Sequence, residues 1–115
     1  MTKAREYDIT IDAGATFSRT LTFSQNDSAF DFTGYSNPRS QVRKTPRDDA
    51  FTAFSVSIDS DPTTGILRWT MDDSDTLALA AEGQRFYYDL LITNRDSEEE
   101  KYLFGEATVR YNVTR

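Results

Sequence analysis

Cysteine and histidine are both absent from the 115 residues of this sequence. Without cysteine the chain can form neither a disulfide framework nor a thiolate metal site. Without histidine it lacks the most common general base and the most common ligand of transition metals, which excludes most hydrolase sites built on Ser-His or Cys-His pairs. No pair of carboxylates stands out from the turn and helix-capping residues. We therefore expect no catalytic residue, no metal site and no cofactor.

Basic charge and long apolar runs are also scarce. Lysine and arginine number 13 against 19 aspartates and glutamates, giving a net charge of −6. This charge argues against sequence-independent nucleic-acid binding and suits either a soluble protein or a partner with a basic patch. The apolar runs are too short to span a membrane, and no apolar segment follows the start as a signal peptide requires. We expect a flexible, polar N-terminal segment over residues 1–6 and a single domain over residues 7–115.

The sequence does contain many aromatic residues and a clear alternation of apolar and polar positions. Eight Phe, six Tyr and one Trp supply much of a core. Alternating segments separated by turn signals every roughly eight to twelve residues predict an all-β fold, an antiparallel β-sandwich of seven or eight strands. The predicted strands cover residues 7–11, 16–23, 30–32, 39–44, 51–58, 66–71, 87–93 and 103–113.

Pairing can be predicted for some of these segments. The last two, joined by a short charged loop, predict the central hairpin of the sheet, and the segments 51–58 and 66–71 predict a second hairpin. The segment 39–44 carries many charges, which favours an edge strand. Gly105 lies inside a strand pattern and predicts a β-bulge or a close approach of another backbone.

One helix is expected between the two hairpins. Residues 72–83 predict a short crossover helix of two turns at most, capped by Asp73 or Ser74 and ended by Gly83. The preceding segment 59–65 matches a calcium loop weakly, but it lacks the distal glutamate that such a loop needs. We interpret it as a polar hairpin turn.

Three features are candidates for contact with a partner protein. The first is the acidic loop tip formed by Glu98, Glu99 and Glu100, which is either a docking point for a basic surface or a solvated loop. The second is the basic cluster of Arg39, Arg43, Lys44 and Arg47, which has no interleaved aromatic residues for nucleic-acid binding. Its charges are also explained if they prevent the addition of another strand to a sheet edge. The second face of the strand 87–93 needs cover from a loop or another subunit. The candidate contact residues are Glu98, Glu99, Glu100, Arg39, Arg43, Tyr87 and Leu91.

Several short sequence segments, spread in order along nearly the whole chain, carry a resemblance to a known family. They are Asp8–Phe17, Asp31–Tyr35, Gln41–Arg43, Thr64–Leu67, Asp75–Leu79, Tyr88–Leu90, Gly105–Val109 and Val113–Arg115. Through them the chain resembles small phage structural proteins and domains of tails and baseplates, including the N-terminal domains of baseplate upper proteins. The resemblance implies an immunoglobulin-like β-sandwich and an assembly role, and this family has no catalytic motif to transfer.

From the resemblance and the missing catalytic residues we expect a non-enzymatic adaptor in the virion of a tailed phage. It would join tail or baseplate components such as fibres through protein–protein contacts, in multiple copies, after passing through the host cytoplasm during assembly. Because no receptor-binding or fibre region follows Arg115, we expect a free-standing adaptor. Two alternatives stay open. One is a capsid decoration or head–tail joining protein, and the other is a carbohydrate-binding β-sandwich with Trp69, Tyr87 and Tyr102 as stacking platforms.

Overall fold

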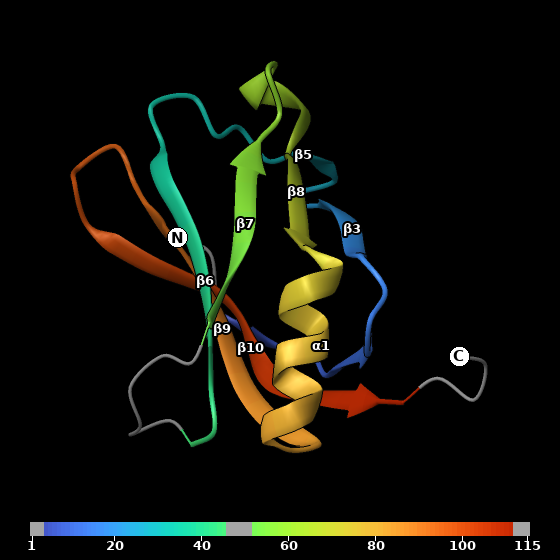
Figure 1. The fold of residues 1–115 in the computed structure, drawn as a ribbon. Helices are drawn as coiled ribbons and strands as arrows, with labels where there is room; N and C mark the ends of the chain where they lie inside the picture. Colours follow the sequence, from blue (N-terminus) through green and yellow to red (C-terminus); the bar gives the residue numbers. More distant parts are fainter. Residues whose placement is uncertain (1–3, 46–51, 112–115) are drawn as a thin grey trace.

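The protein is built mainly from strands (Figure 1). The computed structural model describes residues 4–45 and 52–111. Residues 1–3 of the predicted flexible segment, Arg47 of the basic cluster, the first residue of the predicted strand 51–58 and the last two of 103–113 lie outside the described residues. The elements are β1 (Arg5–Glu6), β2 (Ile9–Asp12), β3 (Phe17–Thr22), β4 (Ser24–Gln25), β5 (Ser28–Ala29), β6 (Ser36–Arg43), β7 (Thr52–Ile58), the 3-10 helix η1 (Pro62–Thr64), β8 (Ile66–Met71), α1 (Asp73–Glu82), β9 (Arg85–Thr93) and β10 (Glu99–Arg110).

Most of the strands belong to one mixed sheet. Its order is β1-β10-β9-β6-β7-β8-β3, β2 pairs with β10 next to β1, and β4 and β5 form a separate small hairpin. Both predicted hairpins, β9–β10 and β7–β8, are present. The prediction of antiparallel pairing throughout is wrong at one edge, because β1 and β2 run parallel to β10. Alternation reveals which face of a strand is buried, but it carries no information on the direction of the neighbouring strand.

The sheet curls until its two edges meet at one end. β2 and β3 lie at opposite edges, yet only residues 13–16 connect them. Gly14 takes a φ of +77° in this tight turn, a conformation that glycine adopts at little cost. We call this end of the sheet the helix end, because α1 also lies there, and the opposite end the hairpin end (Figure 1).

The helix α1 is attached to the turn that joins the two sheet edges. Its N-cap is Asp72, not the predicted Asp73 or Ser74, and Gly83 is the C-cap as predicted. The ten residues between them exceed the two turns predicted. The buried Thr76 hydroxyl accepts a hydrogen bond from the Gly14 N–H at 3.1 Å and lies 2.9 Å from the Ala15 carbonyl, to which it donates. Within residues 4–45 and 52–111 no helix is long and apolar enough to cross a membrane.

The core fills the inside of the curled sheet. The ring of Trp69 lies 5.2 Å from Phe17, 4.8 Å from Phe54 and 5.1 Å from Tyr88, measured between ring centroids. Aromatic rings at these separations and tilts stabilise a core beyond the area they bury. The alternation predicted for β9 is confirmed, since its inward residues Phe86, Tyr88, Leu90 and Ile92 are all buried.

A second group of aromatic rings fills the hairpin end. Phe30 lies 4.7 Å from Phe32 and 5.9 Å from Tyr102, and Phe23 lies 5.5 Å from the same tyrosine. The loop that carries Phe30 and Phe32 thus covers the hairpin end of the core with its aromatic rings. The small β4–β5 hairpin that precedes this loop does not join the main sheet.

A β-bulge changes the phase of β10 relative to β9. The register shifts between Lys101 and Leu103, and both Tyr102 and Leu103 are buried. From Leu103 to Arg110 the alternation is regular, so Phe104 points outward and is 37% exposed, whereas Gly105 is buried. The bulge changes the side of the residues before it, because it buries Tyr102 and directs Lys101 to the outside of the sheet.

The charged strand β6 lies in the interior of the sheet, between β7 and β9, so the prediction of an edge strand over 39–44 is wrong. Ser40 and Val42 are buried, and the Ser40 hydroxyl donates to the Asp89 carbonyl at 2.6 Å. The charged residues Arg39 and Arg43 alternate with them and therefore point outward. The charges mark an exposed face of the strand, not an exposed edge.

The segment between β7 and β8 is a polar turn, as predicted. Asp61 precedes η1, and its carboxylate accepts a hydrogen bond from the Thr63 N–H at 3.1 Å. Asp59 and Arg68 form an ion pair across the turn, with an N–O distance of 2.5 Å. The hydrogen bond from Arg68 lowers the pKa of Asp59 below its ordinary value of 3.8.

Candidate functional site

Four of the predicted contact residues lie together on the outside of the sheet. Arg43 is the register partner of Tyr87, and Arg39 is the register partner of Leu91. On β10, Lys101 pairs with Leu91 as well. Because side chains directly opposite each other share one face of a sheet, these residues form one surface. We call it the outer face and define it by the outward residues of three strands: Arg39, Gln41, Arg43, Tyr87, Asp89, Leu91, Lys101, Phe104 and Glu106.

A cleft of about 580 Å³ lies on the outer face. Tyr87 and Phe104 supply aromatic surface, and the Lys101 ammonium lies 5.9 Å from the centre of the Phe104 ring. Carboxylates outnumber cations around the cleft, which gives it an acidic character. The charged residues are Glu6, Asp8, Asp89, Glu106, Arg43 and Lys101.

The acidic loop adjoins the outer face through an ion pair. The Arg39 guanidinium lies 2.5 Å from the Glu99 carboxylate and donates to the Asn37 carbonyl at 2.9 Å. An exposed pair of this kind contributes little to stability. Its effect is to hold Arg39 at the loop end of the outer face, where two of the predicted contact residues, Arg39 and Glu99, lie side by side.

The other two predicted glutamates contact the side chain of Asn94. The Asn94 amide donates to both Glu98 and Glu100 at 3.3 Å, and the Tyr102 hydroxyl donates to Glu100 at 3.0 Å. Ser97 takes a φ of +63° in the turn of residues 95–97, which contains no glutamate. The prediction of an acidic loop tip is therefore wrong for Glu99 and Glu100, which are the first residues of β10 and present their negative charge beside the turn.

Arg95 fixes this loop to the neighbouring loop at the hairpin end. Its Nε donates to the Thr33 carbonyl at 2.5 Å, and its guanidinium lies 5.4 Å from the centre of the Tyr35 ring. Asp31 lies beside this contact, and hydrogen bonds from Thr33 lower the pKa of Asp31. The position of this turn thus depends on contacts between segments more than 60 residues apart.

Tyr88 connects the inner side of the cleft to the start of the chain. Its hydroxyl donates to the Tyr7 carbonyl, and Glu106 N–H donates to the Asp8 carboxylate at 3.0 Å. Burial raises the pKa of Tyr88 well above its ordinary value of 10.0, so the phenol stays a neutral donor at physiological pH. Arg5 and Glu6, which we expected in a flexible segment, pair with β10 beside this contact.

The outer face also contains residues that the sequence did not single out, namely Gln41, Asp89, Lys101, Phe104 and Glu106. Strict alternation from the end of β10 would have indicated Phe104 and Glu106 as outward. Lys101 could not be assigned without knowing that the bulge at Tyr102 shifts the phase. Among the described residues, no group of three or more acidic side chains is arranged to hold a metal ion.

Comparison with known proteins gives no assignment: no protein-family model matches the chain, and no curated protein matches its sequence.

Proposed function

We propose that this protein is a non-enzymatic adaptor that joins components of the tail or baseplate of a tailed phage. The observation that carries the adaptor role is the outer face, where contact candidates from β6, β9 and β10 form one surface. The phage setting rests on the resemblance of the ordered sequence segments. On the same basis we propose that the curled sheet is a variant of the immunoglobulin-like sandwich.

The outer face has the composition of a protein interface. Tyr87 and Leu91 are half-buried and Phe104 is exposed, and aromatic residues surrounded by a polar rim are enriched where proteins bind each other. The carboxylates around the cleft and beside the loop favour a partner with a basic patch. Attraction between opposite charges would also raise the rate of association with that partner. Other virion proteins are the proposed partners, with no role for nucleic acid or membrane.

Two further functions use the same fold. A capsid decoration or head–tail joining protein would dock through the same face, and copy number separates these roles from a tail adaptor. A carbohydrate-binding role required three aromatic platforms, but Trp69 and Tyr102 are buried in the core. Only Tyr87 stays available, so no observation favours this alternative.

Cross-linking in purified particles tests the proposal. Lys101 supplies an amine on the outer face, so an amine-reactive cross-linker should join it to a second virion protein, which mass spectrometry identifies. Leu91→Glu should prevent incorporation into particles, because it places a carboxylate in the interface. Leu77→Glu is the matched control, since Leu77 is 58% exposed on α1, away from the outer face.

The results distinguish the possible roles. A few to a few dozen copies per particle support a tail or baseplate adaptor, and hundreds support decoration of the capsid. Absence of the protein from purified particles would overturn the proposal. Incorporation of the Leu91→Glu variant at the level of Leu77→Glu would overturn the assignment of the outer face.

A further inference from the structure

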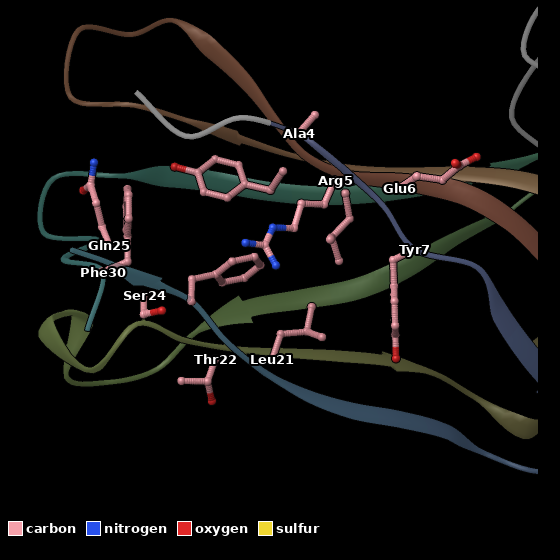
Figure 2. Close-up of a pocket in the computed structure, with 12 residues that line it drawn as sticks. Ala4, Arg5, Glu6, Tyr7, Leu21, Thr22, Ser24, Gln25 and Phe30 are labelled. Carbon is pink, nitrogen blue, oxygen red and sulfur yellow. The ribbon is translucent and has the colours of Figure 1, made fainter. Parts of the chain in front are cut away.

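A second cleft lies where the curled sheet stays open. β1 and β3 are the free edges of the sheet, and a cleft of about 710 Å³ separates them toward the hairpin end (Figure 2). This volume lies in the range of clefts that bind ligands. One wall comes from β1 and the linker that follows it, and the other from β3, β4 and the loop after β5.

The free edge of β3 presents unpaired backbone groups to this cleft. The Phe23 N–H donates to the Gly65 carbonyl at 2.8 Å, while the Phe23 carbonyl accepts from the Phe30 N–H at 3.0 Å, so the N–H of residue 23 points to the β8 side. In an antiparallel ladder the residues point alternately toward and away from the neighbouring strand. Thr20 and Thr22 therefore direct their N–H and C=O groups into the opening, where no backbone group of residues 4–45 or 52–111 pairs with them.

The lining of the cleft combines apolar and polar side chains, with one cation among them. Leu21 and Phe23 lie partly buried on one wall, Leu103 is buried, and Thr22, Ser24 and Gln25 are polar lining residues. Figure 2 shows the Arg5 guanidinium extending into the cleft, whereas Glu6 points away from it. Within the described residues the exposed Arg5 side chain has neither an ion-pair partner nor a side-chain hydrogen-bond partner, so the cleft offers one unpaired positive charge beside Leu21 and Phe23.

We propose that this cleft binds an extended segment of a partner protein, which adds as a strand to the free edge of β3 and places an Asp or Glu carboxylate against Arg5. Strand addition supplies backbone hydrogen bonds, and alternate side chains of the added segment point inward. One inward position is acidic and meets Arg5, and an adjacent inward position, two residues away, is apolar and meets Leu21 or Phe23. The inference deepens the proposed adaptor function by giving the chemistry of one partner segment, and it rests on that function.

Selection from a library of random nine-residue peptides tests the proposal on the purified full chain. Bound peptides should share an Asp or Glu with an apolar residue two positions before or after it. Arg5→Glu should weaken the binding of a selected peptide by about tenfold or more, because it removes one charge-assisted hydrogen bond and places a like charge against the peptide carboxylate. Arg85→Glu changes the net charge equally on an exposed residue outside the cleft and should leave the affinity unchanged.

Two further measurements locate the binding. The amide resonances of Thr20 and Thr22 should shift, and their hydrogen exchange should slow, when the selected peptide binds. An unchanged melting temperature of Arg5→Glu shows that this variant is folded. Selection of no peptide, selection of peptides without an acidic residue, or equal binding by Arg5→Glu and the parent chain would each overturn the proposal, as would self-association of the free chain that occupies the cleft.

The outcome is separable from that of the proposed function. Incorporation into particles is tested by variants of the outer face, and it can succeed when no peptide binds the cleft. Conversely, peptide binding that depends on Arg5 stands as measured even if the protein is absent from virions.

Discussion

Replacing Gly105 by alanine should destabilise the protein through a contact between strands that are distant in sequence. An ideal Cβ at this position would lie 2.6 Å from the Tyr7 carbonyl oxygen and 2.8 Å from the Asp8 carboxylate. Neither atom is the end of a long flexible side chain, because one belongs to the backbone and the other to a short side chain that accepts a hydrogen bond from Glu106. The linker between β1 and β2 must therefore move away from β10.

The expected loss is about 2 kcal/mol of unfolding free energy. Overpacking costs about 1–3 kcal/mol, and weakening the hydrogen bond from Tyr88 to the displaced Tyr7 carbonyl costs about 1 kcal/mol. The lower backbone entropy of alanine in the unfolded chain returns about 0.4–1 kcal/mol. For a chain of this length the loss corresponds to a decrease of about 8 °C in melting temperature.

Urea unfolding followed by the fluorescence of Trp69 measures the effect, since this residue is the single tryptophan and is buried. Thr108→Ala, on the exposed side of β10, is the control and should change stability by less than about 0.5 kcal/mol. Tyr88→Phe combined with Gly105→Ala should cost less than the sum of the two single changes, because both act on the Tyr7 carbonyl. A Gly105→Ala variant as stable as the parent would refute the reasoning.

Three further changes test other contacts of the fold. Thr76→Val should cost about 1–3 kcal/mol in urea unfolding, because it removes the hydrogen bonds of the buried hydroxyl with the Gly14 amide and the Ala15 carbonyl, each contributing about 0.5–1.5 kcal/mol; a loss under about 0.5 kcal/mol would contradict the role of this hydroxyl. Gly65→Ala should cost about 3 kcal/mol, since φ is +71° and a Cβ would meet backbone atoms; normal thermal stability would contradict it. Asp59 has a folded pKa below 3.8, so the stability from its pair with Arg68 is present above pH about 4 and is lost as pH falls through the folded value. The melting temperature of Asp59→Asn should accordingly fall less between about pH 5 and pH 2.5 than that of the parent, and identical pH profiles would show that the pair contributes nothing.

The sequence was sufficient to predict what depends on local alternation. The inward residues of β9, both hairpins and the position of the helix follow from periods and turn residues that lie within a few positions of each other. Of the two predictions for Gly105, a β-bulge or a close backbone approach, the close approach is confirmed by the Tyr7 carbonyl, and the bulge lies at Tyr102 instead. Predicting these features does not require knowing which distant segments of the chain pack together.

The errors concern relations between distant segments. The charges of β6 predict an edge strand, yet β6 lies between β7 and β9 with Ser40 and Val42 buried on its inner side. The parallel pairing of β2 with β10 joins residues about 98 positions apart, and no local pattern records the direction of such a pair. The bulge at Tyr102 likewise could not be predicted, although it buries Tyr102 and directs Lys101 to the outer face.

The directions of the edge strands explain why the open cleft suits an added strand. β2 ends and β3 begins at the helix end, so the two edges of the sheet run antiparallel to each other and diverge toward the hairpin end. A segment inserted between them can run antiparallel to β3 and parallel to β1, which repeats the way β10 already lies between β9 and β1. Such a segment would close the curled sheet and remove its last free edges. Because it binds only the folded chain, its binding would raise the melting temperature with concentration, and a peptide that binds without this increase would not be occupying the opening between the edges.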